Sequence, residues 1–206
     1  MTLDDLQKWT ENWGRRTNAT KTTYFIFSLS HKKKNIKLSL KKQVLEEEPA
    51  PKYLGVTFDP RLTWKHQTNE CQRRGIKRMQ LLRKLAGTTW GANTNVLRKT
   101  YLGYVRRVLE YGIAAWGTCS NAQLNKVEKV QNHCTRIVSG AMKSTPIIQM
   151  ESYIGIKSIA EQRDEKILTQ YNKVKFMDTQ PLHQHTKRKT KSRLKRKSFV
   201  STGQPP

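Results

Sequence analysis

The sequence predicts an α+β fold that is predominantly α: short strands and a hairpin at the N-terminal side, then a helical bundle, then a disordered basic tail. Three segments before residue 60 are rich in β-branched and aromatic residues or alternate apolar with polar positions. After Trp64, apolar residues recur every three or four positions, as on one face of a helix. From Pro181 onward this spacing is lost. These observations divide the chain into residues 1–60, 61–180 and 181–206.

A short amphipathic helix is predicted at the N-terminal side. Residues 2–5 have the pattern of a capping box, and Gly14 is placed to end the helix. The apolar residues of this segment recur at helical spacing: Leu6, Trp9 and Trp13.

Strands are predicted next. Residues 22–29 (TTYFIFSL) and residues 52–58 (KYLGVTF) each predict one strand, and Gly55 inside the second indicates a bulge or a close backbone approach. Ile36, Leu38 and Leu40 alternate with polar residues, as in a half-exposed strand. Lys41-Lys42 stands where a tight turn would favour Asn-Gly, which weakens the signal for a hairpin there.

Five long or capped helices are predicted after Trp64. The first three follow the apolar spacing of residues 76–85, 96–109 and 124–138, and the third ends at Gly140. Thr145-Pro146 predicts an N-cap followed by proline at the first helical position. Ser158 begins a capping box with Glu161, and the last helix carries Ile159, Ile167, Tyr171 and Val174.

The net charge of +25 is the strongest indication of a partner. A chain this basic attracts polyanions, so we expect RNA or DNA, bound through phosphates, rather than a membrane. No apolar run is long enough to predict a membrane span. The N-terminal residues carry Asp4 and Asp5 and no apolar signal segment, so we expect a nuclear or cytoplasmic protein and not a secreted one.

The cysteines and histidines do not predict a metal site. Cys71, Cys119 and Cys134 are widely spaced and form no Cys-x-x-Cys pair, so we expect buried, reduced thiols. His183 and His185 flank Gln184 without a neighbouring cysteine or carboxylate.

Short segments in a fixed order carry a resemblance to a known family. On the N-terminal side they are Trp13-Gly14, residues 18–22, Phe27-Ser28, residues 52–59 and residues 61–65. Further along they are Trp90-Gly91, residues 108–112, Trp116-Gly117, Val130-Gln131, Arg136-Ile137, Gly140-Ala141 and residues 143–146. From about Leu3 to Lys175, the chain resembles the reverse transcriptases of jockey-type non-LTR retrotransposons, in the region just after the catalytic aspartates.

The resemblance implies the end of the palm, the primer-grip hairpin, the thumb and the helices that follow it. The family alternates apolar strand residues between Trp-Gly and the following Asn, where this chain has Arg15 and Thr17. Its activity is RNA-directed DNA synthesis, for which two adjacent palm carboxylates hold divalent metal ions. The family's aromatic-Ala-Asp-Asp turn is absent from this sequence. We therefore expect no catalytic residue and no cofactor in this chain, and Mg²⁺ only in a complete polymerase.

The carboxylate runs that are present have simpler interpretations. Asp4-Asp5 stands at a helix start, where negative charge is favourable. Residues 46–48 (EEE) lie in a polar segment before Pro49, as a solvated charge run would.

Several residues are candidates for nucleic-acid contact. By resemblance, Tyr53, Leu54 and Gly55 belong to the primer grip, although a plain core strand explains them as well. Lys21 corresponds by resemblance to a lysine near the leaving pyrophosphate, although an ordinary surface lysine explains it as well. Arg74, Lys77 and Arg78 have the spacing of a basic stripe on one helix, which either follows a phosphate backbone or is a solvated face. The tail adds two basic clusters, which suit nuclear import or a loose nucleic-acid arm: Lys187, Arg188 and Lys189, then Lys195, Arg196 and Lys197.

The functional expectation is a fragment of a non-LTR reverse transcriptase that is inactive as a polymerase and binds nucleic acid without sequence preference. Two alternatives remain open from the sequence. One is a binding module that charge alone holds to RNA or DNA. The other is a decayed transposon remnant without a selected function.

Overall fold

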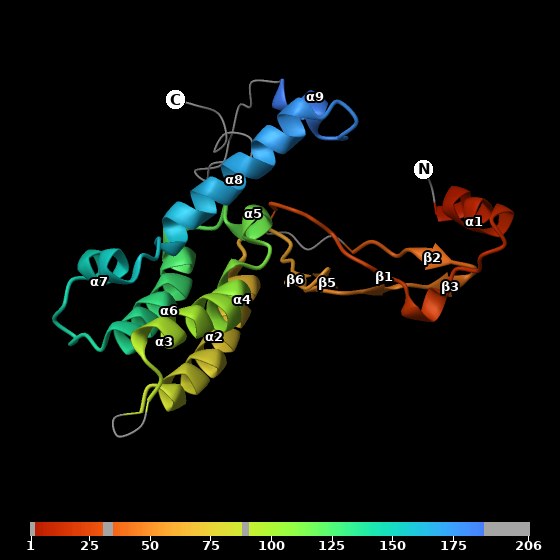
Figure 1. Ribbon diagram of the computed structural model, residues 1–206. Coiled ribbons are helices and arrows are strands. Elements are labelled where there is room, and N and C mark those ends of the chain that lie inside the picture. Colours follow the sequence, from red (N-terminus) through yellow and green to blue (C-terminus); the bar gives the residue numbers. More distant parts are fainter. Residues whose placement is uncertain (1–2, 31–34, 88–90, 188–206) are drawn as a thin grey trace. The chain divides into compact units, whose positions relative to one another are not determined.

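The computed structural model describes residues 3–30, 35–87 and 91–187 (Figure 1). The chain separates into two compact units, unit 1 over residues 1–63 and unit 2 over residues 64–206. In the described residues, the strands all lie in unit 1 and the long helices in unit 2. The predicted class, α+β and predominantly α, is therefore confirmed. None of the described helices is both long and apolar enough to span a bilayer.

Unit 1 begins with the predicted amphipathic helix, α1 (Leu3–Asn12). The backbone turns at Gly14, whose φ of +64° lies in the left-handed region that glycine adopts without strain. Thr2 of the predicted capping box lies outside the described residues. No residue of α1 is fully buried within the chain.

The strand that the family resemblance implies around Arg15 and Thr17 does not form. Arg15 is exposed and follows α1 without regular structure. Asn18 then caps the 3₁₀ turn η1 (Ala19–Lys21), because its side-chain oxygen accepts a hydrogen bond from the Thr20 backbone N–H at 3.0 Å. A charged arginine is therefore held in solvent rather than on a buried strand face, which removes its desolvation cost.

The strands of unit 1 are shorter than predicted and pair only two by two. β1 (Thr23–Tyr24) runs parallel to β4 (Glu46–Glu47), and β2 (Ser39–Leu40) runs antiparallel to β3 (Gln43–Val44). Only two residues of the predicted strand over residues 22–29 are therefore in a described pair. Lys41-Lys42 weakened the sequence signal for a hairpin, but the structure forms one there. Both lysines adopt positive φ, +52° and +65°, and the buried neighbours Leu40 and Leu45 stabilise the turn from inside.

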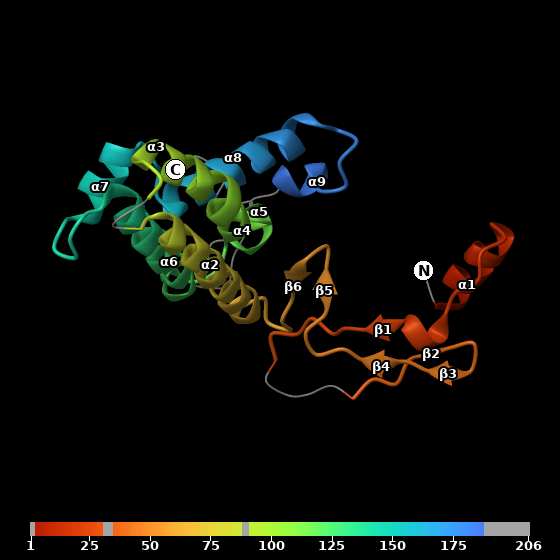
Figure 2. The ribbon, with the colours of Figure 1, turned by 60° about the horizontal axis from the view of Figure 1, so that its bottom comes forward.

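The prediction of a single strand over residues 52–58 is wrong, because this segment folds back on itself. β5 (Lys52–Tyr53) pairs antiparallel with β6 (Val56–Thr57), and Figure 2 shows the two arrows side by side. Leu54 and Gly55 form the turn, with φ of +46° and +81°. Gly55 is thus a turn residue rather than a bulge, and the hairpin that the family resemblance implies is present.

Unit 2 consists of helices joined by short turns. They are α2 (Lys65–Leu85), α3 (Thr94–Thr100), the π-helical segment η2 (Tyr101–Arg106), α4 (Arg107–Glu110), α5 (Ile113–Trp116), α6 (Asn121–Ser139), α7 (Ile147–Ile154), α8 (Ile159–Phe176) and α9 (His183–Thr186). The second predicted helix is interrupted, because residues 101–106 are π-helical. Gly140 ends α6 with a φ of +69°, and Ser158 caps α8 by accepting from the Glu161 backbone N–H, both as predicted. Pro146 is the N-cap of α7 rather than its first helical residue, because its ψ of 138° is extended.

α2 and α6 form the centre of unit 2 and run side by side in the same direction (Figures 1 and 2). The Thr68 hydroxyl of α2 donates to the Gln123 side-chain oxygen of α6 at 2.9 Å. One turn further along α6, the Lys126 ammonium donates to the Asn69 side-chain oxygen of α2 at 2.8 Å. Near its middle, α2 carries the buried Gly75, where its neighbours leave no room for a side chain. A Cβ built on this glycine would lie 2.6 Å from Leu109 Cδ2 and 3.0 Å from Val130 Cγ1.

Polar side chains connect the other helices to this centre. Gln131 of α6 is fully buried, accepts from the Tyr101 hydroxyl at 2.8 Å, and donates to the Glu151 carboxylate at 2.8 Å. Arg106 is also buried and pairs with Glu110, to which Lys166 of α8 adds a contact at 3.2 Å. A buried charge without such partners would be strongly destabilising.

The folded region extends past residue 180, where the basic tail was predicted to begin. α9 packs on α8, with His183 and Thr186 buried and His183 Nε2 lying 3.0 Å from the Asp178 carboxylate. Residues 188–206, the remainder of the predicted disordered tail, lie outside the described residues.

We predict that Gly75→Ala destabilises the protein although alanine is the better helix former. The added methyl would overlap Leu109 and Val130, and overpacking of this kind costs about 1–3 kcal/mol, against about 1 kcal/mol gained in helix propensity. Thermal unfolding followed by circular dichroism measures the change. Gly103→Ala is the matched control, because a Cβ there meets nothing within 4 Å, so its melting temperature should stay equal or rise. A Gly75→Ala variant as stable as Gly103→Ala would contradict the close approach.

Candidate nucleic-acid interface

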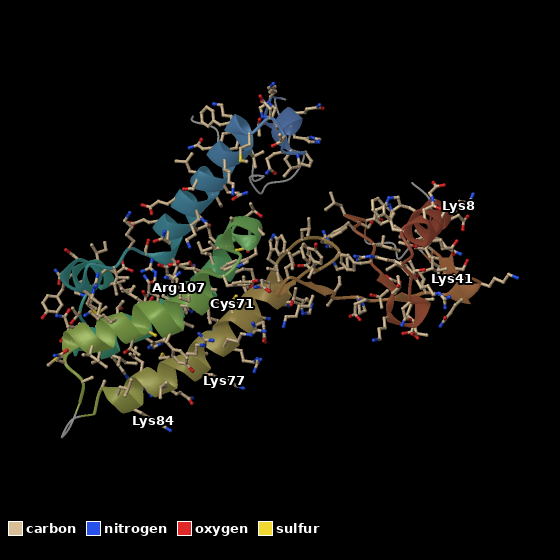
Figure 3. The ribbon with its side chains drawn as sticks, turned by 45° about the vertical axis from the view of Figure 1, so that its right-hand side comes forward. Lys8, Lys41, Cys71, Lys77, Lys84 and Arg107 are labelled. Atoms are coloured by element: carbon tan, nitrogen blue, oxygen red, sulfur yellow. The ribbon has the colours of Figure 1, made fainter. Side chains whose placement is uncertain are left out.

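The outer side of α2 carries basic side chains that point into solvent. The inner side is fixed by the buried residues Cys71, Gly75 and Leu82. On the opposite side lie Arg73, Lys77 and Lys84, all exposed, at spacings of four and seven residues that keep them on one helix face. Figure 3 shows Lys77 and Lys84 extending away from the helices that pack on α2.

α6 extends this surface. Lys126 lies beside α2 because of its hydrogen bond to Asn69, and Lys129, one turn further, is exposed. We call these residues of the two helices the α2–α6 basic face: Arg73, Lys77, Lys84, Lys126 and Lys129. The sequence analysis missed the two α6 lysines. Their position on the polar side of an amphipathic helix was visible, but the neighbouring helix was not.

The stripe predicted on α2 is only partly oriented toward solvent. Lys77 faces outward, but Arg74 Nε donates to the Glu70 carboxylate at 2.7 Å. Arg78 Nη1 donates to the Tyr104 backbone oxygen at 2.5 Å, and its guanidinium lies 4.5 Å from the centre of the Tyr104 ring. Arg78 therefore joins α2 to the π-helical segment η2. Its charge lies at the side of α2 and not on the side that carries Lys77.

Glu70 is the acidic residue beside the α2–α6 basic face. Both of its oxygens accept hydrogen bonds from Arg73 at 2.8 Å, and one accepts from Arg74. These arginines, Arg73 most strongly, lower the pKa of Glu70 from 4.5 to about 2, against the opposing effect of desolvation. Because the folded-state pKa is depressed, the stabilisation is present above pH 4.5 and is lost only as the pH falls toward 2. At physiological pH, Glu70 therefore partly neutralises two arginines.

The hairpin residues proposed for the primer grip stand at an exposed tip. The side chains of Tyr53 and Leu54 are 67% and 74% exposed, so they are not part of a core strand. Val56, across the turn, is buried instead. Lys21 is exposed at the end of η1. Of the tail candidates, Lys187 is exposed after α9, and Arg188, Lys189, Lys195, Arg196 and Lys197 lie outside the described residues.

The described residues offer little for catalysis. Among them, no group of three or more His, Cys, Asp or Glu side chains is arranged to hold a metal ion. Asp4 and Asp5 lie in the first turn of α1, and Glu46 and Glu47 are exposed in β4. All three cysteines are buried, as predicted, and burial raises the pKa of the Cys71 thiol to about 11 and that of Cys134 to about 12. These thiols are therefore protonated and poor nucleophiles at neutral pH.

Three curated polymerases of Drosophila melanogaster are similar to this chain in sequence. The probable RNA-directed DNA polymerase from transposon BS is 26% identical over 214 residues, which cover 98% of this chain and 23% of that protein. The RNA-directed DNA polymerase from mobile element jockey is 32% identical over 143 residues, or 68% of this chain and 15% of that protein. A probable polymerase from the X-element is 24% identical over 144 residues. The chain spans less than a quarter of the length of these relatives. No family model and no solved structure matches it.

We predict that Glu70→Gln strengthens binding to nucleic acid, because Arg73 and Arg74 would exchange an internal carboxylate for phosphates. The log–log dependence of affinity on salt should steepen by about 0.9 for each additional duplex phosphate neutralised. Fluorescence anisotropy of a labelled duplex measures both effects. Glu165→Gln is the matched control, since Glu165 of α8 also pairs with a cation, Lys157, but lies outside the α2–α6 basic face. Equal gains in the two variants would mean that net charge, and not the position of Glu70, sets the affinity.

Proposed function

Because this chain is related over most of its length to the RNA-directed DNA polymerases of jockey-type non-LTR retrotransposons, we propose that it is a reverse-transcriptase segment that binds nucleic acid through phosphates and does not polymerise DNA by itself. The α2–α6 basic face is the observation that supports binding most directly.

The dimensions of this face suit a phosphate backbone. Arg73 and Lys84 are eleven residues apart on α2, which corresponds to about 16 Å along a helix axis. Over this length the three basic residues Arg73, Lys77 and Lys84 can each contact a phosphate of a backbone that passes across α2. The lysines of α6 widen this row of residues into a surface. Such contacts position a nucleic acid without reading its bases, so we expect no sequence preference.

The absence of polymerase activity in the isolated chain is the second part of the proposal. Reverse transcription needs adjacent carboxylates that hold two divalent ions at the reacting phosphate. In this sequence, the only paired aspartates are Asp4 and Asp5, whose place in the first turn of α1 is explained by the helix dipole. In the proposal, Mg²⁺ belongs to a complete polymerase and not to this chain.

The interface is tested by charge reversal on the α2–α6 basic face. Lys77→Glu, Lys84→Glu and Lys129→Glu together should weaken binding and flatten the salt dependence by about 0.9 for each phosphate that is no longer neutralised, or roughly 3 units on duplex DNA. Anisotropy titrations between low and moderate salt measure this, in the full chain and in a chain ending at Lys187, which retains α9.

The control makes the same change of charge elsewhere in unit 2. Lys99→Glu, Lys143→Glu and Lys173→Glu alter three exposed lysines outside the face. If both triple variants bind equally well, binding depends on net charge alone and the interface proposal fails. If the salt dependence of binding disappears completely in the chain ending at Lys187, the tail rather than the folded body binds nucleic acid.

The proposed lack of polymerase activity in the isolated chain is tested by a primer-extension assay. The purified chain should incorporate no nucleotides on a primed RNA template with Mg²⁺ or Mn²⁺, because it lacks a metal-binding carboxylate pair. Product formation above a blank without protein, abolished in the Asp4→Asn, Asp5→Asn variant, would show that these aspartates are catalytic.

A further inference from the structure

Two tryptophans are exposed at the C-terminal end of α1: Trp9 lies in its last turn, and Trp13 lies in the turn that follows Asn12. The side chains of Trp9 and Trp13 are 54% and 70% exposed, and their ring centres lie 6.2 Å apart. Their rings are neighbours and together form one apolar surface at the end of α1. Tryptophan buries more apolar area than any other side chain, and exposed clusters of this kind mark docking surfaces.

The rest of unit 1 shows the same imbalance between buried and exposed apolar side chains. Its buried hydrophobic residues are Leu40, Leu45 and Val56, whereas Phe27, Leu29 and Val44 are more than half exposed. Its described strands pair only two by two, and isolated two-stranded sheets are marginally stable. One of the pairs is parallel, an arrangement that other parts of a protein normally cover on both faces. Unit 1 is therefore built like one side of a larger folded body.

The charge of α1 selects the kind of partner. Asp4, Asp5 and Glu11 against Lys8 leave three acids and one base, a net charge of −2 on a helix of a chain whose total is +25. Arg15 and Arg16 follow Trp13, so residues 3–16 together are neutral. This surface lacks the positive charge that would attract phosphates, so a polypeptide surface fits it better.

The relatives identify a polypeptide of the right kind. The segment similar to this chain is 23% of the BS polymerase, so more than three quarters of that protein accompanies it in one polypeptide. We propose that the Trp9–Trp13 surface at the end of α1 docks this chain onto the remaining body of a BS-type polymerase supplied as a separate polypeptide. The contact is apolar and centred on the two indoles. It goes beyond nucleic-acid binding and does not depend on the α2–α6 basic face.

The test measures binding of the full chain to a soluble, monodisperse BS polymerase from which the matched segment has been deleted. Both proteins are treated with nuclease, and titration calorimetry is run at about 0.5 M salt, where the Debye length is only a few ångströms. The expected result is a complex that Trp9→Lys, Trp13→Lys weakens about 30-fold or more, as the removal of a central anchor does. Trp9→Phe, Trp13→Phe should retain part of the affinity.

The control introduces two lysines at apolar positions of unit 2 that are even more exposed, 81% and 77%. Ile148→Lys, Phe176→Lys should bind within about two-fold of the unaltered chain, because these side chains lie outside α1. Failure of the unaltered chain to bind, or an equal affinity for the tryptophan-to-lysine variant, overturns the proposal. A complex that forms only when the nuclease treatment is omitted also overturns it, since nucleic acid would then bridge the proteins. Self-association of the chain alone that vanishes in the tryptophan-to-lysine variant would assign the Trp9–Trp13 surface to a second copy instead. None of these outcomes bears on the salt titrations of the α2–α6 basic face.

Discussion

The close approach of three helices at Gly75 is the constraint on which unit 2 depends. Leu109 of α4 and Val130 of α6 both lie where a side chain at this position would be. Because α2 is held this closely, its buried side is fixed over its whole length, from Gln67 to Leu82. The lysines on the opposite side of α2 are therefore exposed to solvent. The position of the α2–α6 basic face is therefore a consequence of core packing, and not only of composition.

Electrostatics then separates the arginines from the lysines. Arg106 is buried and paired with Glu110, Arg74 is paired with Glu70, and Arg78 lies over Tyr104. The planar, forked guanidinium suits such fixed contacts, whereas the lysine ammonium is strongly hydrated and remains in water. Carboxylates are few in this chain, and several of them hold an arginine in place. The charge left for a phosphate backbone is consequently carried largely by lysines.

The local features of the chain could be predicted from its sequence. Helical spacing after Trp64 predicted α2 and α6, Ser158 predicted the start of α8, and Gly140 predicted the end of α6. These features depend on neighbours a few residues apart, which a single sequence displays directly. The ordered short motifs also predicted the kinship that the Drosophila polymerases support. The sequence by itself thus determined the fold class and the excess of positive charge.

Tertiary structure decided which residues meet. The reversal at Leu54-Gly55 could be mistaken for the middle of one strand, because a two-residue turn has the apolar neighbours of a strand. The orientation of Arg78 depends on Tyr104, 26 residues away, and the partnership of Lys126 with α2 depends on Asn69, 57 residues away. Periodicity gives the buried face of each helix but not the register between two helices. That register follows from side-chain volume, here the missing Cβ of Gly75, and it decided which basic residues share a surface.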